Sequence, residues 1–294
     1  MRAFGIFAGL TAASIWGGMF VVSKVVLDII PPFTLVSLRL ILGIGCLAII
    51  LTFRGGFQAD RRQAIEAIIV GFIGFGVSIG LQFLGTKLST AANAALVTST
   101  SSTFIFLFGV WLLGERITLE RVVALVLATL GVIVVVDPRQ ALVGGKAFWG
   151  NVALFGAALT WGLYSVLVKR VSKRLRVMEV SLLAFLGGLF ISLPLTGVEI
   201  MRIGLGEITL PVILGVLYLG LVSTALAMYL WNKSLALLDA GLVSVLFFAQ
   251  PIVGVGLGAL FLGERLGLTF WIGAMLISAG LIITSRTKSP IGNI

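Results

Sequence analysis

The fold of this chain is decided by Ala94–Arg116, AALVTSTSSTFIFLFGVWLLGER, which returns as Val243–Arg265, VSVLFFAQPIVGVGLGALFLGER. Each stretch is long and apolar enough to cross a bilayer, and each closes with Leu-Gly-Glu-Arg. The alignment continues without a gap, so that Gly131 corresponds to Gly280. Self-similarity at a fixed spacing indicates two copies of one structural unit. In a membrane protein, such a duplication is typical of transporters.

Composition places the chain in a membrane. Hydrophobic residues make up 59% of the 294 residues and charged residues only 11%, whereas a soluble domain carries about 25% charged residues. One cysteine and no histidine exclude a disulfide framework, a Cys-based metal site and the commonest general base. The net charge of +10 is spread between apolar runs, so it indicates topology rather than nucleic-acid binding. We expect no cofactor and no metal.

The apolar runs predict an all-α integral membrane protein with ten transmembrane helices. Each run approaches the roughly 20 residues that a spanning helix needs. Pro31-Pro32 ends the first helix, and Asp137-Pro138 with the following Gly144-Gly145 ends the fifth. The expected spans are 4–27, 33–53, 64–85, 91–113, 118–136, 148–169, 179–198, 209–231, 240–262 and 267–285.

Helix parity then predicts how the two copies are related. We expect two five-helix repeats, residues 1–143 and 144–294. Because five is odd, the second repeat enters the membrane from the opposite face, which makes the repeats inverted. Fourteen of the 21 lysines and arginines fall on one side of this arrangement, so we expect both termini in the cytoplasm. The usual substrate site of such a protein lies at mid-membrane, between the repeats.

The chain resembles the EamA-type ten-helix exporters of the drug/metabolite transporter superfamily over essentially its whole length. The residues that carry the resemblance are Trp16-Gly17 and Trp161-Gly162 in the first helix of each half, Arg39 in Ser-Leu-Arg-Leu, Gln250-Pro251, and the two Gly-Glu-Arg triplets. The sequence looks most like bacterial exporters of aromatic and other amino acids. The resemblance implies a monomeric inner-membrane exporter whose partners are the lipid bilayer and a small-molecule substrate, an amino acid or a related metabolite. The first half departs from the pattern, having Ser102 opposite Pro251, so the two helices need not bend alike.

We expect the pocket where helices 1, 3 and 4 meet helices 6, 8 and 9. Hydroxyls in the run 98–103 can line a cavity or simply let helices pack closely. Pro251 removes one helical hydrogen bond and frees the Phe247 carbonyl, which suits either a gating bend or a structural kink. Aromatic rings offer flat surfaces to an apolar side chain, or fill the core. The candidate substrate-binding residues are Trp16, Gln82, Thr98, Ser101, Trp161, Tyr164, Tyr229 and Gln250, with Pro251 as the gating or kink residue.

Charged residues inside the spans are few. Arg39 and Lys24 lie near enough to the outer interface to snorkel, although buried charges in lipid are often functional. All eleven acidic residues fall at or near span ends, so no mid-membrane carboxylate is placed to relay a proton. The simplest mechanism is facilitated export by alternating access. A multidrug or other metabolite exporter and proton coupling through Glu66 or Lys169 remain alternatives, whereas an enzyme is disfavoured.

Overall fold

The computed structural model describes residues 1–89, 94, 97–136, 145–262 and 267–286, and these residues form helices and connecting turns without a strand. Six continuous helical stretches are long and apolar enough to cross a membrane. Two of them are built from three consecutive segments each. The six are α1 (Arg2–Leu27), α2 (Pro32–Phe53), α3–η1–α4 (Arg61–Gly71, Phe72–Ser78, Ile79–Leu88), α8 (Gly145–Val171), α9 (Val177–Arg202) and α10–η3–α11 (Leu210–Leu217, Tyr218–Leu226, Ala227–Leu237).

The remaining helices are shorter. They are α6 (Ser101–Leu113), α7 (Leu119–Val136), α12 (Ala240–Leu246), α13 (Ala249–Leu262) and α14 (Leu268–Arg286). Their positions follow the expected spans, except that the start of the span 91–113 lies partly outside the described residues. The seam at Asp137-Pro138 and the second Gly-Glu-Arg triplet, 263–265, also lie outside them. Six long helices and several shorter apolar ones are therefore what the structure shows, against ten expected spans.

Four of the spanning stretches are irregular near their middles, at matching places in the two sequence copies. The third and eighth expected spans contain the π-helical segments η1 and η3. The fourth is interrupted by a turn at Thr100, before α6, and the ninth by a turn at Phe247 and Phe248, between α12 and α13. The two helices therefore break alike, although only the second contains a proline. Such interruptions in helices are frequent at functional sites.

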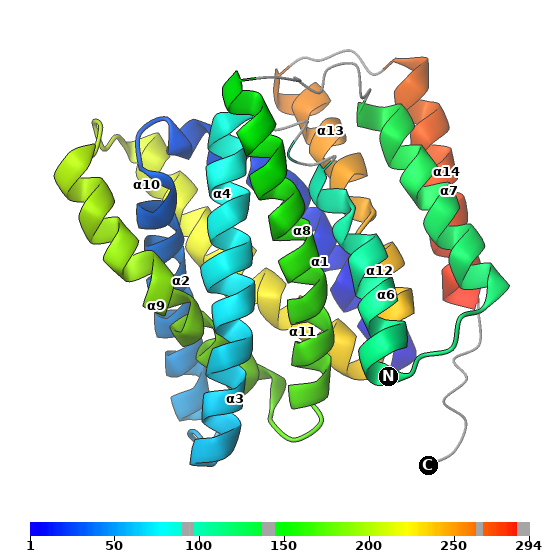
Figure 1. Ribbon diagram of the computed structural model, residues 1–294, viewed down its shortest axis with the longest axis horizontal. Helices are drawn as coiled ribbons and strands as arrows, with labels where there is room; N and C mark the ends of the chain where they lie inside the picture. The colour runs from blue at the N-terminus through cyan, green and yellow to red at the C-terminus, as the bar shows by residue number, and fades with distance from the viewer. Residues whose placement is uncertain (90–93, 95–96, 137–144, 263–266, 287–294) are drawn as a thin grey trace.

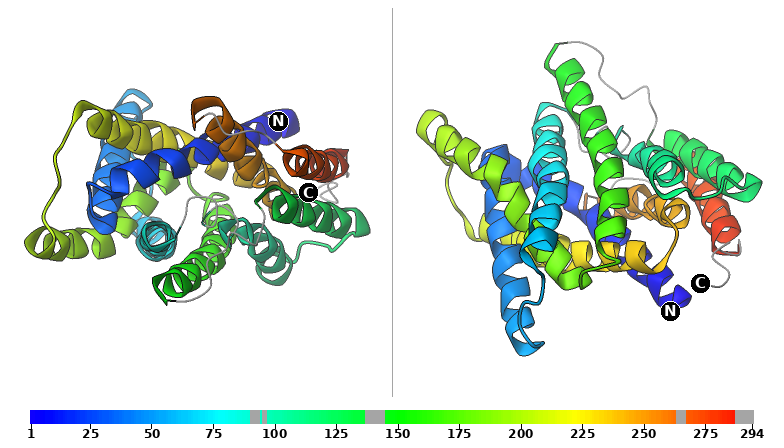
Figure 2. Two further views of the ribbon diagram at one scale, coloured as in Figure 1. Left: turned by 90° about the horizontal axis from the view of Figure 1, so that it is seen from above. Right: turned by 60° about the horizontal axis from the view of Figure 1, so that its bottom comes forward.

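Each copy packs mainly against the other copy. Helix α1 lies against α11 and α13, and its counterpart α8 lies against α4 and α6. Likewise α2 packs on η3 while α9 packs on η1. The pairs α2–α9 and α7–α14 stand at opposite edges of the bundle, as both views show (Figures 1 and 2). The large hydrophobic core is therefore built from both copies together.

The Trp-Gly pairs bring the first helix of each copy close to the broken helix of the other. A Cβ on Gly17 would lie 2.7 Å from the backbone oxygen of Gln250, in α13. A Cβ on Gly162 would lie 2.5 Å from the Cβ of Phe104, in α6. Both distances are shorter than a side chain tolerates, so only glycine permits these two approaches. The neighbouring tryptophans are thereby held beside the interruptions.

Candidate functional site

A cavity lies where six expected helices meet, as the sequence predicted. It is enclosed by α1, the η1–α4 stretch, the helical residues on both sides of Thr100, α8, α11 and the α12–α13 break. Every lining side chain is uncharged. They are Trp16, Met19, Ser78, Ile79, Gln82, Thr98, Ser101, Ala157, Trp161, Met228, Phe247 and Gln250. The cavity is small, about 30 Å³, whereas sites for small molecules usually measure several hundred Å³. A small-molecule ligand of ordinary size therefore needs side chains or helices to move before it fits.

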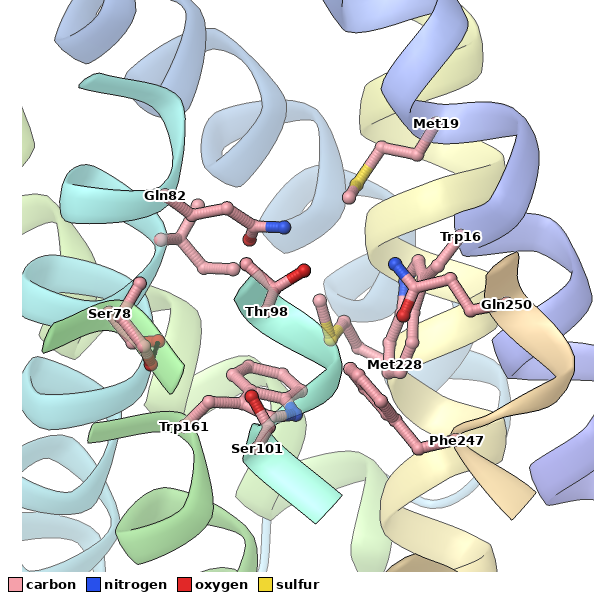
Figure 3. Close-up of a pocket in the computed structure, with 12 residues that line it drawn as sticks. Trp16, Met19, Ser78, Gln82, Thr98, Ser101, Trp161, Met228, Phe247 and Gln250 are labelled. Carbon is pink, nitrogen blue, oxygen red and sulfur yellow. Dashed lines mark hydrogen bonds between the residues drawn. The ribbon is translucent and has the colours of Figure 1, made fainter. Parts of the chain in front are cut away.

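Polar groups enter this cavity from both copies. The amide ends of Gln82 and Gln250 point toward each other across the space, with the Thr98 hydroxyl between them (Figure 3). Thr98 donates its own proton to the Ala94 carbonyl, at 2.6 Å. A hydroxyl oxygen carries two acceptor lone pairs, and the two amides can both donate and accept. Such neutral groups can hold a polar or zwitterionic ligand without a large desolvation cost.

Two tryptophans from equivalent positions meet beside the cavity. The rings of Trp16 and Trp161 are edge to face, with centroids 5.6 Å apart and an interplanar angle of 86°. Trp16 donates its indole N–H to the Ser223 carbonyl, at 3.0 Å. The indole nitrogen of Trp161 is buried and has no hydrogen-bond partner among the described residues. A buried, unpaired donor in a cavity wall calls for an explanation, and a ligand or a water that accepts from it supplies one.

Six of the nine residues singled out from the sequence line the cavity: Trp16, Gln82, Thr98, Ser101, Trp161 and Gln250. Tyr164 is fully buried next to Trp161 and donates its hydroxyl to Asn232, at 3.2 Å. Tyr229 is half-buried and, like Tyr164, is not among the lining residues. Pro251 is buried in the first turn of α13.

Sequence reasoning also missed part of the site. Met19, Ser78, Met228 and Phe247 line the cavity, and none of them is distinguished by charge or spacing from neighbours in the same apolar run. The carbonyl of Phe247, which the sequence predicted to be freed by Pro251, accepts instead from the Gln250 N–H, at 3.1 Å. The break thus satisfies this carbonyl with a tighter turn, as buried backbone groups require.

The two basic residues inside spans do not snorkel freely. Arg39 is 1% exposed and turned toward the interior. The Lys24 ammonium donates to the carbonyls of Thr86 and Ser89, at 3.3 and 2.9 Å. At the equivalent position of the second copy, the Lys169 ammonium donates to the carbonyl of Leu238. Each lysine thus donates to carbonyls at the end of the third helical stretch of its own copy, which is α4 for Lys24 and α11 for Lys169. A cation at the C-terminal end of a helix interacts favourably with the helix dipole.

An ionic cluster joins the α6–α7 connection to the end of α8 and the start of α12, and these segments lie at the end of the bundle where α1 begins (Figure 1). Glu115 accepts from the backbone N–H groups of Ala240 and Gly241, at 2.7 and 3.0 Å. The Lys169 ammonium lies 3.0 Å from the same carboxylate. Arg121 lies 3.8 Å from Glu115 and 2.5 Å from Asp239.

This cluster joins parts of the chain that the sequence keeps far apart. It ties the α6–α7 connection of the first copy to α8 and to the start of α12 in the second. Its four charged side chains are between 3% and 11% exposed. A second cavity, of about 320 Å³, lies beside it and includes Arg116 and Lys173 in its wall. The first Gly-Glu-Arg triplet thus ends α6 with Gly114 in the left-handed conformation and, through Glu115, bridges the two copies.

Comparison with known proteins identifies the family to which the chain belongs. The model of the EamA-like transporter family matches the chain twice, over residues 3–137 and 148–286. The chain belongs to the EamA-like transporter family. A probable amino-acid metabolite efflux pump of Salmonella typhimurium is 30% identical over 94% of this chain and 93% of its own length. Its counterpart in Escherichia coli is 30% identical over 96% and 94%, respectively.

Further relatives have names that state no substrate. An uncharacterized Bacillus subtilis transporter, YetK, is 27% identical over 98% of this EamA chain and 89% of its own length. One solved crystal structure superposes with a TM-score of 0.82 at 22% identity, covering 97% of this chain and 99% of the other. At that identity the likeness concerns the fold alone. This EamA protein is thus a multi-pass membrane transporter related to metabolite exporters.

Proposed function

We propose that this protein exports amino acids with aromatic or hydrophobic side chains across the bacterial inner membrane, by facilitated alternating access. The observation that carries the proposal is the uncharged cavity between the two copies, which combines aromatic rings with amide, hydroxyl and indole groups. An apolar side chain fits against Trp16, Trp161 and Phe247. The amino and carboxyl groups of the substrate find acceptors and donors in Gln82, Gln250 and the unpaired Trp161 N–H.

The same proposal assigns the membrane topology. The chain spans the membrane ten times as two inverted repeats, residues 1–143 and 144–294, and both termini face the cytoplasm. The equivalent packing of α1 and α8 on the opposite copies supports this relation, as does the double match to the family model. Because both copies contribute to the cavity wall, a rocking motion of one copy against the other exposes the cavity alternately.

The ionic cluster of Glu115, Arg121, Lys169 and Asp239 is the closed gate on one side in this scheme. It joins the copies at the end where α1 begins, which the proposed topology makes cytoplasmic, and its buried ion pairs support the proposal that they hold that side closed. Opening requires these buried charges to separate, and the free energy comes from new contacts made elsewhere when the copies rock. The breaks at Thr100 and at Phe247–Phe248 are the hinges that permit this rearrangement.

The alternative is a multidrug or other metabolite exporter, with or without coupling to protons. Organic cations are usually held by a buried carboxylate, and no carboxylate is among the residues that line the described cavity. That observation favours a neutral or zwitterionic substrate over a cationic drug. Proton coupling would need a titrating group that changes its environment during transport, for which Glu66 and Lys169 are the candidates from the sequence.

Uptake of labelled phenylalanine, methionine and threonine into proteoliposomes tests the proposal. We expect phenylalanine and methionine to equilibrate and not to accumulate, whether or not a pH gradient is imposed. Accumulation above equilibrium would show coupled transport and replace the facilitated mechanism. Absence of transport of all three amino acids would overturn the substrate class and bring other metabolites forward.

A further inference from the structure

A buried arginine behind the cavity wall has donors that find no acceptor in the described part of the chain. Arg39 is 1% exposed in α2, within the bundle. Its guanidinium donates to Thr224 Oγ1 at 2.7 Å, to Ser223 Oγ at 3.3 Å and to the Met19 sulfur at 3.6 Å. A guanidinium carries five N–H groups. Two donors therefore lack an acceptor among the described residues, and a third has only a thioether, which is a weak acceptor.

No acidic side chain in the described segments forms an ion pair with Arg39. The ion pairs among the described residues involve Arg121, Lys169 and Arg176, and none includes Arg39. Besides its hydrogen bonds, the guanidinium lies over the face of the Phe83 ring, whose centroid is 5.0 Å from the guanidinium carbon. Hydroxyls and a ring stabilise a cation far less than a carboxylate does in a medium of low dielectric. The surroundings of the Arg39 guanidinium therefore favour the binding of an anion.

The guanidinium is one flexible side chain away from the cavity. Met19 contacts Arg39 through its sulfur and at the same time lines the cavity. Gln82, which also lines it, is the sequence neighbour of Phe83. Methionine has three freely rotating bonds and adapts its shape easily. A rotation of Met19 as the cavity expands would therefore uncover the unused donors.

We propose that Arg39 recognises the carboxylate of the transported substrate, reached by displacement of the Met19 side chain. This inference rests on the proposed function and makes it more specific, since it requires a substrate that carries a carboxylate and disfavours amines. Guanidinium matches a carboxylate in shape and can donate two parallel hydrogen bonds to it. The uncharged lining of the cavity then holds the rest of the ligand, while the positive charge of Arg39 lies at one edge of the cavity.

Binding to purified protein tests this with three ligands that share one side chain. The ligands are phenylalanine, 3-phenylpropionate, which keeps only the carboxylate, and phenethylamine, which keeps only the amine. We expect wild-type protein to bind both carboxylates at least tenfold more tightly than the amine, as charge-assisted hydrogen bonds imply. Arg39→Gln is expected to abolish this preference, and Arg39→Lys to restore part of it. Arg54→Gln, which removes an exposed arginine at the end of the same helix, should change nothing.

A second variant keeps the test independent of whether Arg39→Gln folds. Met19→Ala removes the side chain that covers the guanidinium, so it should tighten binding of 3-phenylpropionate severalfold and leave phenethylamine unaffected. If wild-type protein binds neither carboxylate, or binds the amine equally well, the inference is overturned. If it binds 3-phenylpropionate through Arg39 but does not transport phenylalanine, the inference stands and the amino-acid proposal fails. If it transports phenylalanine while Arg39→Gln retains the preference, only the inference fails.

Discussion

Substituting Glu115 by glutamine should open the end of the molecule that the ionic cluster is proposed to close. Glutamine keeps the size of the side chain and can still accept one hydrogen bond from the start of α12 through its oxygen. Its amide nitrogen cannot accept the second bond that the carboxylate now receives from Gly241. The substitution also removes the negative charge that lies 3.0 Å from Lys169 and 3.8 Å from Arg121.

The magnitude follows from the burial of these charges. Breaking a fully buried ion pair by removing one partner costs about 3–5 kcal/mol, because the other charge is left uncompensated. Glu115 and Lys169 are 10% and 11% exposed, beside a cavity of about 320 Å³, so water reduces the cost. We therefore expect the closed state to lose about 2–3 kcal/mol. Since 1.4 kcal/mol corresponds to a factor of ten, the closed-to-open ratio should fall about 30- to 150-fold.

Thiol labelling measures this ratio. Cys46 is the single cysteine, and replacing it by serine leaves a background in which Ala157→Cys places one thiol in the cavity wall. A membrane-impermeant maleimide is applied from each side, in vesicles of both orientations. In Glu115→Gln, the rate of labelling from the side of the ionic cluster should rise, by at most the change of about 30- to 150-fold in the closed-to-open ratio. Adding Lys169→Met should reverse much of the rise, because the stranded cation is then gone.

Two results would refute this reasoning. The first is unchanged labelling in a Glu115→Gln protein that melts at the same temperature as the parent, since the cluster would then not hold this end closed. The second is an equal rise in Glu120→Gln. Glu120 is an exposed acid in the first turn of α7 and forms no ion pair with the described residues, so its neutralisation should leave labelling unchanged.

Three further predictions concern the cavity and its hinges. Gly17→Ala and Gly162→Ala should each lower the free energy of unfolding by about 1–3 kcal/mol, because the new Cβ would meet neighbours at 2.7 and 2.5 Å. The loss should appear as a lower melting temperature in detergent. Gly45→Ala is the neutral control, because a Cβ there would have no neighbouring atom within 4 Å. Trp161→Phe removes an unpaired N–H and should weaken amino-acid binding several-fold with little change in melting; unaltered binding would show that this donor does not touch the substrate. Pro251→Ala should slow uptake without changing equilibrium binding, and only modestly, because the matching break at Thr100 forms without a proline; a complete loss of binding would contradict the hinge role.

The sequence singled out many of the residues that line the cavity because they are chemically conspicuous. Gln82, Thr98, Ser101 and Gln250 are polar groups in apolar spans, and such groups must find partners or a cavity. Met19, Met228 and Phe247 were missed, since an apolar side chain in an apolar run carries no sign of the neighbour it faces. Tyr164 has the right chemistry for a pocket, but its hydroxyl is taken by Asn232, a partner 68 positions away along the chain.

The sequence by itself determined that this is a duplicated helical membrane protein and roughly where its helices run. Water is absent from the bilayer core, so each span must satisfy its own backbone, and length and apolarity are enough to mark it. Only the tertiary structure decided which faces meet. Helices that are apolar nearly all round can turn any side toward their neighbours, so the contact between Trp16 and Trp161, the inward turn of Arg39 and the bridge from Glu115 to α12 depend on packing between the copies. The two matching breaks illustrate the same difference between sequence and structure. The break at Phe247 has a proline nearby that the sequence reveals, whereas the break at Thr100 forms without a proline and is seen only in the structure.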